Sequence, residues 1–452
     1  MPQAELGPAG PAGARPSIVA RLENSARILA LVKIGNVGLT MLWGFAVTYV
    51  FVRLLPLHEF RAFLLLVAFG NFTVSAELGL TSIAYNRLRR HWLAAKGQGD
   101  ASDFRAEELG VLVALLGGLM LASTVMMIGA VLSGIISTTY PWLFILFFLT
   151  ACLNLFATLS KRALAAVDRN MLWEGLDIGR RLASLLLLFA ALHGLDITIS
   201  VLLQLLLTIA TVLLALSLLH RRLSLKPMQW LALRVGGGHV RKHYLADFGA
   251  SAALTVSEVA AYNAPYFLIA LATHDPRPLL LFDFLFKMSR ALSALVRATI
   301  EAALPRITAA WYRGDAPRFR QLLLRGVAVA SVMAASIAAA LMVIGPQLVS
   351  TLFDGKLVVG RWELALIGLL LLGLGVTCVS VYVQAALGRF RLLLRQSLPF
   401  LAGSLLCVPV SAFLATPTMP FMAIFPFLVV ATYLGTGILH AFALRRLSAS
   451  VA

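Results

Sequence analysis

Five charged residues lie within one long apolar segment, residues 279–303. The five are Asp283, Lys287, Arg290, Arg297 and Glu301. If the segment is an α-helix, a rotation of roughly 100° per residue places all five side chains within an arc of roughly 80°. Charges inside a membrane-spanning helix are costly and usually face water or a partner charge. The stripe therefore predicts contact with a hydrated cavity or with other charges, not with lipid.

The stripe has two interpretations, and both stay open at this point. In the first it is a cationic path for an anionic substrate, in which Arg290 and Arg297 hold phosphate oxygens and Lys287 adds a point charge. In the second the charges only brace the helix. Asp283 would then pair with Lys287 four residues later. Arg297 would pair with Glu301 at the same spacing.

The segment 246–272 carries a carboxylate, Glu258, near its middle. A carboxylate inside a membrane protein can take up and release a proton during a transport cycle. Glu258 and Asp283 are therefore the candidates for coupling transport to a cation gradient. The alternative is that both only neutralise Lys287, Arg290 or Lys33.

Other polar side chains are candidates for lining the same cavity. Lys33 and Asn36 share one face of the segment 28–52, and Asn71 lies within the segment 61–85. Tyr262 lies one turn after the central carboxylate of its segment. Lys33 has a second explanation, because a lysine near the end of a span can extend its amine to the lipid headgroups.

The composition requires a membrane around these segments. The chain of 452 residues is 60% hydrophobic and 13% charged, with a mean hydropathy of +0.89. A soluble domain of this length needs more polar surface. Backbone groups in lipid must satisfy one another, so each apolar run of about 20 residues is expected to be a helix. The runs are 28–52, 61–85, 109–134, 142–160, 171–192, 197–219, 246–272, 279–303, 322–345, 361–387, 397–416 and 420–444.

Lysine and arginine concentrate in alternate loops. The loops of one set are strongly basic, whereas the other set carries only Arg53, Arg277, Lys356 and Arg361. Basic loops stay on the cytoplasmic side, so both termini are expected in the cytoplasm of a bacterial inner membrane. The same loops, facing anionic lipid, account for the net charge of +18 without a nucleic-acid partner.

Two loop sequences recur about half a chain apart. Residues 99–105 (GDASDFR) resemble 314–320 (GDAPRFR), and residues 165–169 (AAVDR) resemble 385–389 (AALGR). This repeat predicts two six-helix bundles related by an axis along the membrane normal, with a substrate path between them. A monomer suffices, because the two halves already enclose one cavity. The expected parts are a cytoplasmic tail with a short amphipathic helix (1–27), bundles at 28–222 and 246–444, a cytoplasmic linker (223–245) and a second tail (445–452).

The cysteines suggest no special chemistry. Cys152, Cys378 and Cys407 lie in apolar runs without metal-type spacing, so we expect neither disulfides nor a metal site. The sequence also lacks a nucleotide-binding motif, and we expect no cofactor.

Several short motifs resemble those of the bacterial polysaccharide-export flippases, a family of the multidrug/oligosaccharidyl-lipid/polysaccharide exporter superfamily. The resemblance covers most of the chain. It departs from the family at Arg61, where glycine is usual, and in the short loop 273–277, which lacks the usual glycine-rich entry to the next helix. The matching motifs are RLLP at 53–56 followed by Glu59-Phe60, ELGL at 77–80, RALAAVDR at 162–169, Pro305, GP at 345–346, LF at 352–353 and ALGRF at 386–390.

The resemblance implies twelve helices in two bundles that alternate between inward-open and outward-open states. It implies an oligosaccharide on undecaprenyl diphosphate as cargo, turned between the leaflets of the inner membrane and driven by an ion gradient. The implied partners are this lipid-linked oligosaccharide, membrane lipids and, as a candidate, the polysaccharide polymerase or export machinery.

Three other functions remain as alternatives. A cation-coupled small-molecule or drug exporter of the related multidrug-extrusion type usually has an acidic or aromatic cavity. A membrane-embedded enzyme, such as a glycosyltransferase or polymerase, usually needs a larger external loop than this chain has, so we expect no enzyme. A passive scaffold would not need a buried charged stripe.

Overall fold

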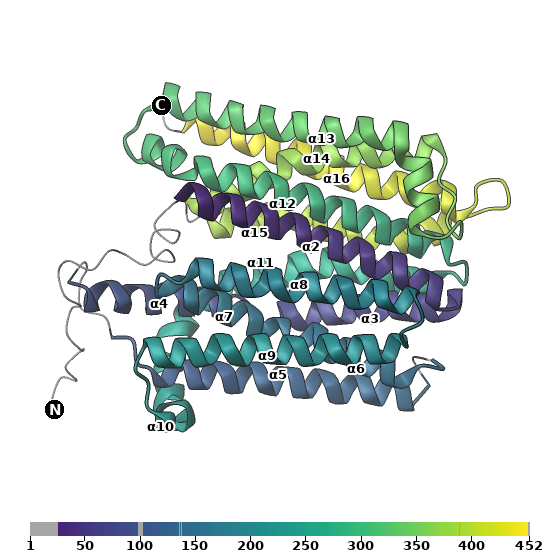
Figure 1. The fold of residues 1–452 in the computed structure, drawn as a ribbon. Coiled ribbons are helices and arrows are strands. Elements are labelled where there is room, and N and C mark those ends of the chain that lie inside the picture. The colour runs from purple at the N-terminus through teal and green to yellow at the C-terminus, as the bar shows by residue number, and fades with distance from the viewer. Residues whose placement is uncertain (1–25, 98–102, 135, 137, 388, 451–452) are drawn as a thin grey trace.

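The computed structural model describes residues 26–97, 103–134, 136, 138–387 and 389–450, and these residues form helices and turns without a strand (Figure 1). The amphipathic helix expected at 17–27 lies almost entirely outside the described residues. The helices are α2 (Ala26–Leu54), α3 (Leu57–Ser75), α4 (Leu80–Ala95), α5 (Glu107–Leu132), α6 (Pro141–Cys152), α7 (Asn154–Ala166), α8 (Asn170–Leu192), α9 (Ile197–Arg222), α10 (Pro227–Leu231), α11 (Leu233–Ala272), α12 (Arg277–Tyr312), α13 (Ala316–Leu352), α14 (Arg361–Ala386), α15 (Phe390–Leu414) and α16 (Phe421–Ala449).

Twelve predicted spans correspond to these helices. In the described residues, ten helical segments are long and apolar enough to cross a membrane, one of them formed by α6 and α7 together. The other two spans are α8 and α12, which carry four or more charged residues each and are long enough to cross. Both run alongside the apolar helices (Figure 1). The prediction of an all-α membrane protein with about twelve spanning helices is confirmed.

The predicted span 61–85 is interrupted in the structure. Helix α3 ends at Ser75 and α4 begins at Leu80, because Leu78 and Gly79 adopt positive φ angles of 52° and 84°. Gly79 adopts this conformation without strain. The Glu77 carboxylate accepts a hydrogen bond from the backbone N–H of Thr81 at 2.9 Å and so begins the new helix. Hydropathy is continuous across the break, so it could not show the interruption.

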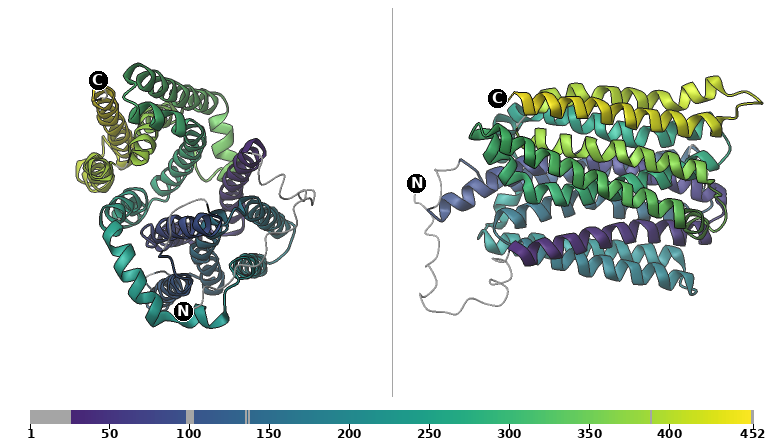
Figure 2. Two further views of the ribbon diagram at one scale, coloured as in Figure 1. Left: turned by 90° about the vertical axis from the view of Figure 1, so that its left-hand side faces the viewer. Right: turned by 90° about the horizontal axis from the view of Figure 1, so that it is seen from above.

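The two halves of the chain pack their helices in the same pattern. In the first half α2 packs on α8, α3 on α6, α5 on α6, α6 on α9 and α8 on α9. In the second half the helices at the equivalent positions make the same five pairings: α11 with α15, α12 with α14, α13 with α14, α14 with α16 and α15 with α16. This agreement supports the internal repeat expected from the loop sequences. The halves form two bundles, seen end-on in Figure 2.

The two ends of the molecule differ. We call the end where α2 begins and α16 finishes the tail end, and the opposite end, which holds the turns 55–56, 273–276 and 353–360, the hairpin end (Figure 1). One hydrophobic core, containing for example Phe51, Phe63, Phe284 and Phe353, joins both bundles toward the hairpin end. Two smaller hydrophobic cores lie near the tail end of the first bundle. Among the described residues, the second bundle contributes to them only through the start of α11.

The connection between the bundles is mostly helical. The segment 223–245, predicted as a linker, contains α10 and the first turns of α11. These turns pack on α5. Gly236 lies so close to the start of α5 that an added Cβ would come within 2.5 Å of the Glu107 carbonyl oxygen. The second bundle thus begins as a helix anchored on the first.

Candidate functional site

A cavity of about 240 Å³ is lined by residues of α11, α12 and α14–α16 of the second bundle. Four of the nine predicted site residues line it: Glu258, Tyr262, Arg290 and Arg297. Other lining residues come from α14, α15 and α16, three helices with few charged residues. They are Thr377, Cys378 and Tyr382 on α14, Ser397 and Phe400 on α15, and Tyr433, Thr436 and His440 on α16.

The cationic wall of the cavity comes from α12. Arg290 and Arg297 are seven residues apart, two turns of helix, so both reach the same cavity. The Arg290 guanidinium carbon lies 5.2 Å from the centre of the Tyr262 ring and 5.3 Å from that of Phe286. The Arg297 guanidinium carbon lies 5.9 Å from the centre of the Tyr382 ring. Cation–π attraction holds the Arg290 guanidinium over its two aromatic rings and leaves its N–H groups available.

Glu258 is the single carboxylate among the described side chains that line the cavity. The cations that line it are Arg290 and Arg297. No carboxylate of the described residues lies within ion-pairing distance of Arg290. The cavity is therefore suited to an anion.

A neutral polar wall of the cavity is formed by Thr377 of α14, Ser397 of α15, and Thr436 and His440 of α16, and His440 also belongs to a buried hydrogen-bond network. His440 Nδ1 and Ser380 Oγ are hydrogen-bonded at 2.8 Å. Gln384 donates hydrogen bonds to Ser380 Oγ at 2.8 Å and to Gln396 Oε1 at 2.9 Å. Aromatic rings close the space between the walls, with the Phe400 ring centre 5.3 Å from that of Tyr262 and 5.0 Å from that of Tyr433. Hydroxyl and imidazole groups beside aromatic rings can bind a neutral polar ligand.

Asp283 and Lys287 lie on the same helix but do not line this cavity. The Lys287 ammonium donates to the Asp283 carboxylate, which also accepts a hydrogen bond from the Tyr266 hydroxyl at 3.0 Å. Asp283 is buried. The geometry of this pair matches the second interpretation of the stripe, in which the charges brace the helix. The second expected pair depends on Glu301, whose side chain lies outside the described part of the chain.

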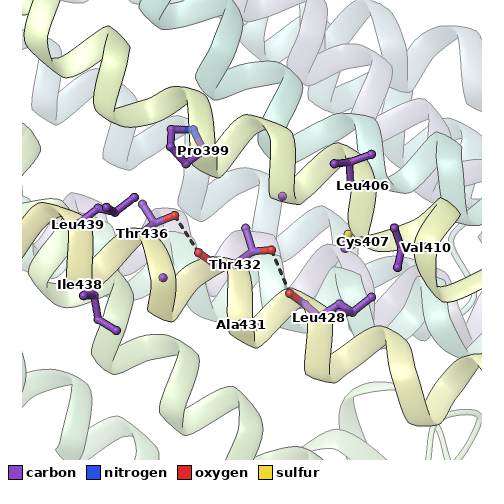
Figure 3. Close-up of a pocket in the computed structure, with 12 residues that line it drawn as sticks. Pro399, Leu406, Cys407, Val410, Leu428, Ala431, Thr432, Thr436, Ile438 and Leu439 are labelled. Carbon is purple, nitrogen blue, oxygen red and sulfur yellow. Dashed lines mark hydrogen bonds between the residues drawn. The ribbon is translucent and has the colours of Figure 1, made fainter. Parts of the chain in front are cut away.

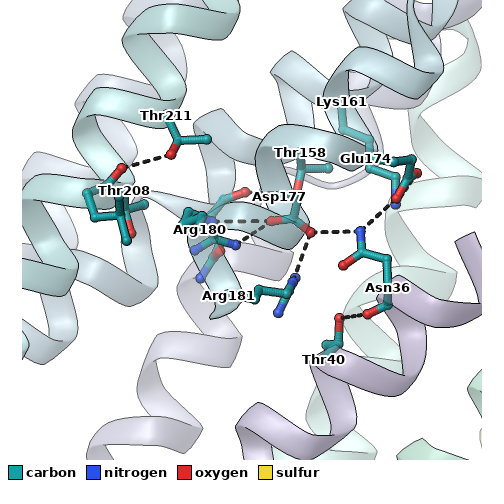
Figure 4. Close-up of polar contacts among 12 residues, drawn as sticks. Asn36, Thr40, Thr158, Lys161, Glu174, Asp177, Arg180, Arg181, Thr208 and Thr211 are labelled. Atoms are coloured by element: carbon teal, nitrogen blue, oxygen red, sulfur yellow. Dashed lines mark hydrogen bonds and ion pairs between the residues drawn. The ribbon is translucent and has the colours of Figure 1, made fainter. Parts of the chain in front are cut away.

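Asn36 belongs to a buried polar cluster of the first bundle (Figure 4). It donates hydrogen bonds to Glu174 at 2.6 Å and to Asp177 at 3.0 Å. Asp177 also accepts from Arg180 at 2.6 Å and from Arg181 at 2.9 Å. The carboxylates are thus paired with cations of their own bundle, and the cluster braces α2 against α8. Lys33 is exposed, one turn before Asn36 on α2.

Asn71 connects the two bundles instead of lining the cavity. It donates a hydrogen bond to Asn263 Oδ1 at 3.2 Å, from α3 to α11. Nearer the hairpin end, Arg61 donates to the carbonyl oxygens of Ala270 at 2.7 Å, Thr273 at 2.6 Å and His274 at 3.0 Å. These carbonyls lie at or just beyond the end of α11, where helix carbonyls lack internal partners.

Two further cations reinforce the connection at the hairpin end. Arg53 donates to the Thr351 carbonyl at 2.6 Å and lies 3.6 Å from the Asp354 carboxylate. The Lys356 ammonium donates to the carbonyl oxygen of Val52. We call Arg53, Arg61 and Lys356 with these partners the hairpin latch. It holds the bundles together at the end where they also share a core.

No metal site is found in the described residues, because no group of three or more His, Cys, Asp or Glu side chains could hold an ion there. The chemistry available in the cavity is therefore that of arginine, carboxylate, imidazole and hydroxyl groups. It can bind and release a ligand and move protons.

The chain was compared with known proteins at the level of fold and sequence. A multidrug resistance MATE family transporter of the MOP superfamily in its inward-facing conformation matches over 93% of this chain and 98% of its own, with a TM-score of 0.66 and 14% identity. The fold is that of MATE transporters. An outward-facing MATE structure matches over 96% of both chains with a TM-score of 0.55 and 14% identity. No protein-family profile and no curated protein matches the sequence.

A third structure with this fold is a MOP superfamily transporter from Pyrococcus furiosus, described as having a binding pocket of reverse polarity that suggests a different function. It matches over 96% of both chains with a TM-score of 0.57 and 12% identity. At such identities the likeness concerns the fold. The other two structures are multidrug resistance transporters, and none of the three distinguishes the polysaccharide-export family that the short motifs resemble.

Proposed function

We propose that this chain is an alternating-access transporter that moves an undecaprenyl-diphosphate-linked oligosaccharide across the inner membrane. The observation that carries the proposal is Arg290, which lines the cavity over the rings of Tyr262 and Phe286 with no carboxylate of the described residues within ion-pairing distance. An arginine with its N–H groups available binds phosphate oxygens in pairs of hydrogen bonds. A cation, the usual charge of a drug, would be repelled.

The two walls fit the two parts of a diphosphate-sugar headgroup. The arginines of α12 face the phosphate, and His440 of the polar wall faces sugar hydroxyls. Ligand pockets for drug-sized molecules usually measure about 300–1,000 Å³. A cavity of about 240 Å³ therefore holds part of a headgroup, and the remaining sugars extend toward the space between the bundles.

The orientation follows from the basic loops. With the tail end in the cytoplasm, the hairpin latch closes the periplasmic side, and this conformation faces inward. Glu258 is the group we propose for ion coupling, because it shares the cavity with the arginines and can neutralise them when the cargo leaves. Asp283, held by Lys287 and Tyr266, is the weaker of the two carboxylates for this role.

A second candidate is a cation-coupled small-molecule exporter. The fold comparisons favour it more directly, since the matched structures are multidrug transporters. Glu258 and the aromatic lining would suit a cationic or aromatic compound. The arginines oppose this candidate, and the structure with a pocket of reverse polarity is an example of the fold with a different function proposed.

Deletion of the gene in its host separates the two candidates. Loss of the flippase should cause lipid-linked oligosaccharide to accumulate on the cytoplasmic side, where periodate or a lectin applied to intact cells does not reach it. An unchanged surface polysaccharide without such accumulation, in a strain with no second flippase, would favour the exporter. Drug sensitivity of the same strain is the matching measurement for that candidate.

A further inference from the structure

A second concavity lies on the outer face of the second bundle, between α15 and α16 (Figure 3). It has a volume of about 530 Å³ and is lined almost entirely by apolar groups. Its rim includes Leu406 and Ile438, which are 56% and 57% exposed. Both helices have the composition of membrane spans, so this α15–α16 groove opens toward lipid.

The floor of the groove is apolar although it contains two threonines. Thr432 donates its hydroxyl to the Leu428 carbonyl at 2.9 Å, and Thr436 donates to the Thr432 carbonyl at 2.8 Å (Figure 3). The hydroxyls are therefore satisfied within α16. The two helices touch at Gly403, where an added Cβ would come within 2.5 Å of Thr432 Cγ2. The floor offers van der Waals contact and no free polar group.

The groove and the cationic cavity share a wall. Thr436 lines both of them. Phe400 and Tyr433, whose ring centres lie 5.0 Å apart, face the cavity from the same two helices whose outer sides form the groove. The two helices therefore separate a cationic, hydrogen-bonding space from an apolar one by a single layer of side chains.

Prolines loosen this layer. Pro399 and Pro409 lie within α15, and Pro426 lies within α16. Each removes a backbone hydrogen bond of its helix and permits bending. The layer beside the groove can thus part locally more easily than an uninterrupted pair of helices.

We propose that the α15–α16 groove is the seat of the substrate's own isoprenoid chain while its diphosphate occupies the cavity. This inference rests on the proposed function. An amphiphile with a diphosphate and a long apolar chain needs both environments at once, and here they adjoin at Thr436. A chain that stays in the groove remains in contact with lipid while its headgroup is inside the protein, so the chain is never exposed to water.

Gly435 gives a clean variant to test the groove. It lines the groove, and an added Cβ there meets no atom within 4 Å. Gly435→Leu should fill the groove without disturbing the helix packing. The matched control is Gly118→Leu on α5, an exposed glycine with equally open surroundings in the first bundle.

The experiment uses purified protein in vesicles and a polyprenyl diphosphate with a diazirine on its chain, located after irradiation by mass spectrometry. Wild type and Gly118→Leu should be labelled on α15 and α16. The amount of label on these helices should be roughly tenfold lower in Gly435→Leu. Equal labelling of Gly435→Leu would overturn the proposal. So would equal labelling by phosphatidylglycerol with the same reactive chain, because the groove would then hold ordinary lipid.

A second measurement distinguishes an error in the groove proposal from an error in the proposed function. Binding of a water-soluble short-chain diphosphate depends on the cavity alone. If wild type binds it and Arg290→Ala does not, while Gly435→Leu is labelled like wild type, only the groove proposal falls. If wild type does not bind the diphosphate, the proposed function falls.

Discussion

The Arg290 guanidinium lies over the Tyr262 ring, with 5.2 Å between the guanidinium carbon and the ring centre. Arg290 comes from α12 and Tyr262 from α11, so the contact joins the first two helices of the second bundle across the cavity. The ring holds the cation in place without neutralising it. A carboxylate in the ring's position would fix the arginine as firmly but would remove its affinity for phosphate.

Replacing Arg290 tests this role. Arg290→Ala should weaken binding of a water-soluble diphosphate by about 10- to 100-fold, the effect of losing hydrogen bonds to a charged group. Arg290→Lys should retain part of the binding, because lysine keeps the charge but not the paired donors. Isothermal titration of the purified protein measures both. Arg361→Ala, an exposed arginine at the hairpin end of α14, is the control. Wild-type binding by Arg290→Ala would reduce the arginine to a packing role.

The hairpin latch should set the conformational balance. Arg61→Ala removes three hydrogen bonds to carbonyls around the end of α11, so the bundles should separate more often at the hairpin end. Spin labels at His58 and His274, both exposed there, should report longer distances in the variant. Arg277→Ala, an exposed arginine beside the same turn, should leave the distances unchanged. An unaltered distribution in Arg61→Ala would show that the shared core, not the latch, closes this end.

Asp283 and Lys287 should behave as a structural pair. Asp283→Asn leaves the Lys287 ammonium without its counter-ion in a mostly buried place, and breaking such a pair costs about 3–5 kcal/mol. The double variant Asp283→Asn with Lys287→Met should recover most of the lost stability, as measured by unfolding in mixed micelles. A stable Asp283→Asn protein that binds cargo but no longer responds to an ion gradient would instead assign Asp283 to coupling.

Asp168 should make a pH-dependent contribution at the tail end. Burial opposes its ionisation, but hydrogen bonds from Lys96, Arg89 and Trp92 outweigh this and lower its pKa to about 2. The unfolded value is roughly 3.9, so the stabilisation is complete above about pH 4 and is lost as the pH falls toward 2. Because Asp168 is 40% exposed, we expect a contribution on the order of 1 kcal/mol.

Asp168→Asn measures that contribution. Asn tolerates the positive φ angle of 60° at this position, so the backbone should not change. The melting temperature of the variant should lie below that of wild type at pH 7, and the difference should shrink as the pH falls below about 4. A difference that stayed constant down to pH 3 would contradict the role of the ion pairs.

The sequence predicted the spans well because lipid imposes a simple rule on helix length and hydropathy. It also singled out Arg290, Arg297, Tyr262 and Glu258, which line the cavity, because polar groups inside a span stand out. The α14–α16 wall with Thr436 and His440 was missed, since single hydroxyl or imidazole groups on apolar helices give little signal. The pairing of Asp283 with Lys287 was one of two open interpretations. Helical spacing alone could not decide whether the Lys287 side chain faces the cavity or Asp283.

The location of the cavity was the other limit of the sequence. The repeat suggested a path between the bundles, and no spacing in the sequence indicated that the residues lining the cavity all come from α11, α12 and α14–α16. Residues such as Asn36 and Asn71 were grouped with the arginines because equivalent helices carry polar groups. Their side chains instead contact Glu174 and Asn263, contacts between residues more than 100 positions apart that no local pattern reveals.

Translocation in a purified system tests the central claim most directly. The protein is reconstituted in vesicles with a polyprenyl-diphosphate oligosaccharide in one leaflet, and periodate added outside measures how fast the sugar appears there under an imposed ion gradient. For a flippase of lipid-linked oligosaccharide we expect rapid appearance with wild type, and none above protein-free vesicles with Arg290→Ala. No transfer by wild type, together with gradient-driven uptake of a cationic dye that survives in Arg290→Ala, would contradict it and identify a small-molecule exporter.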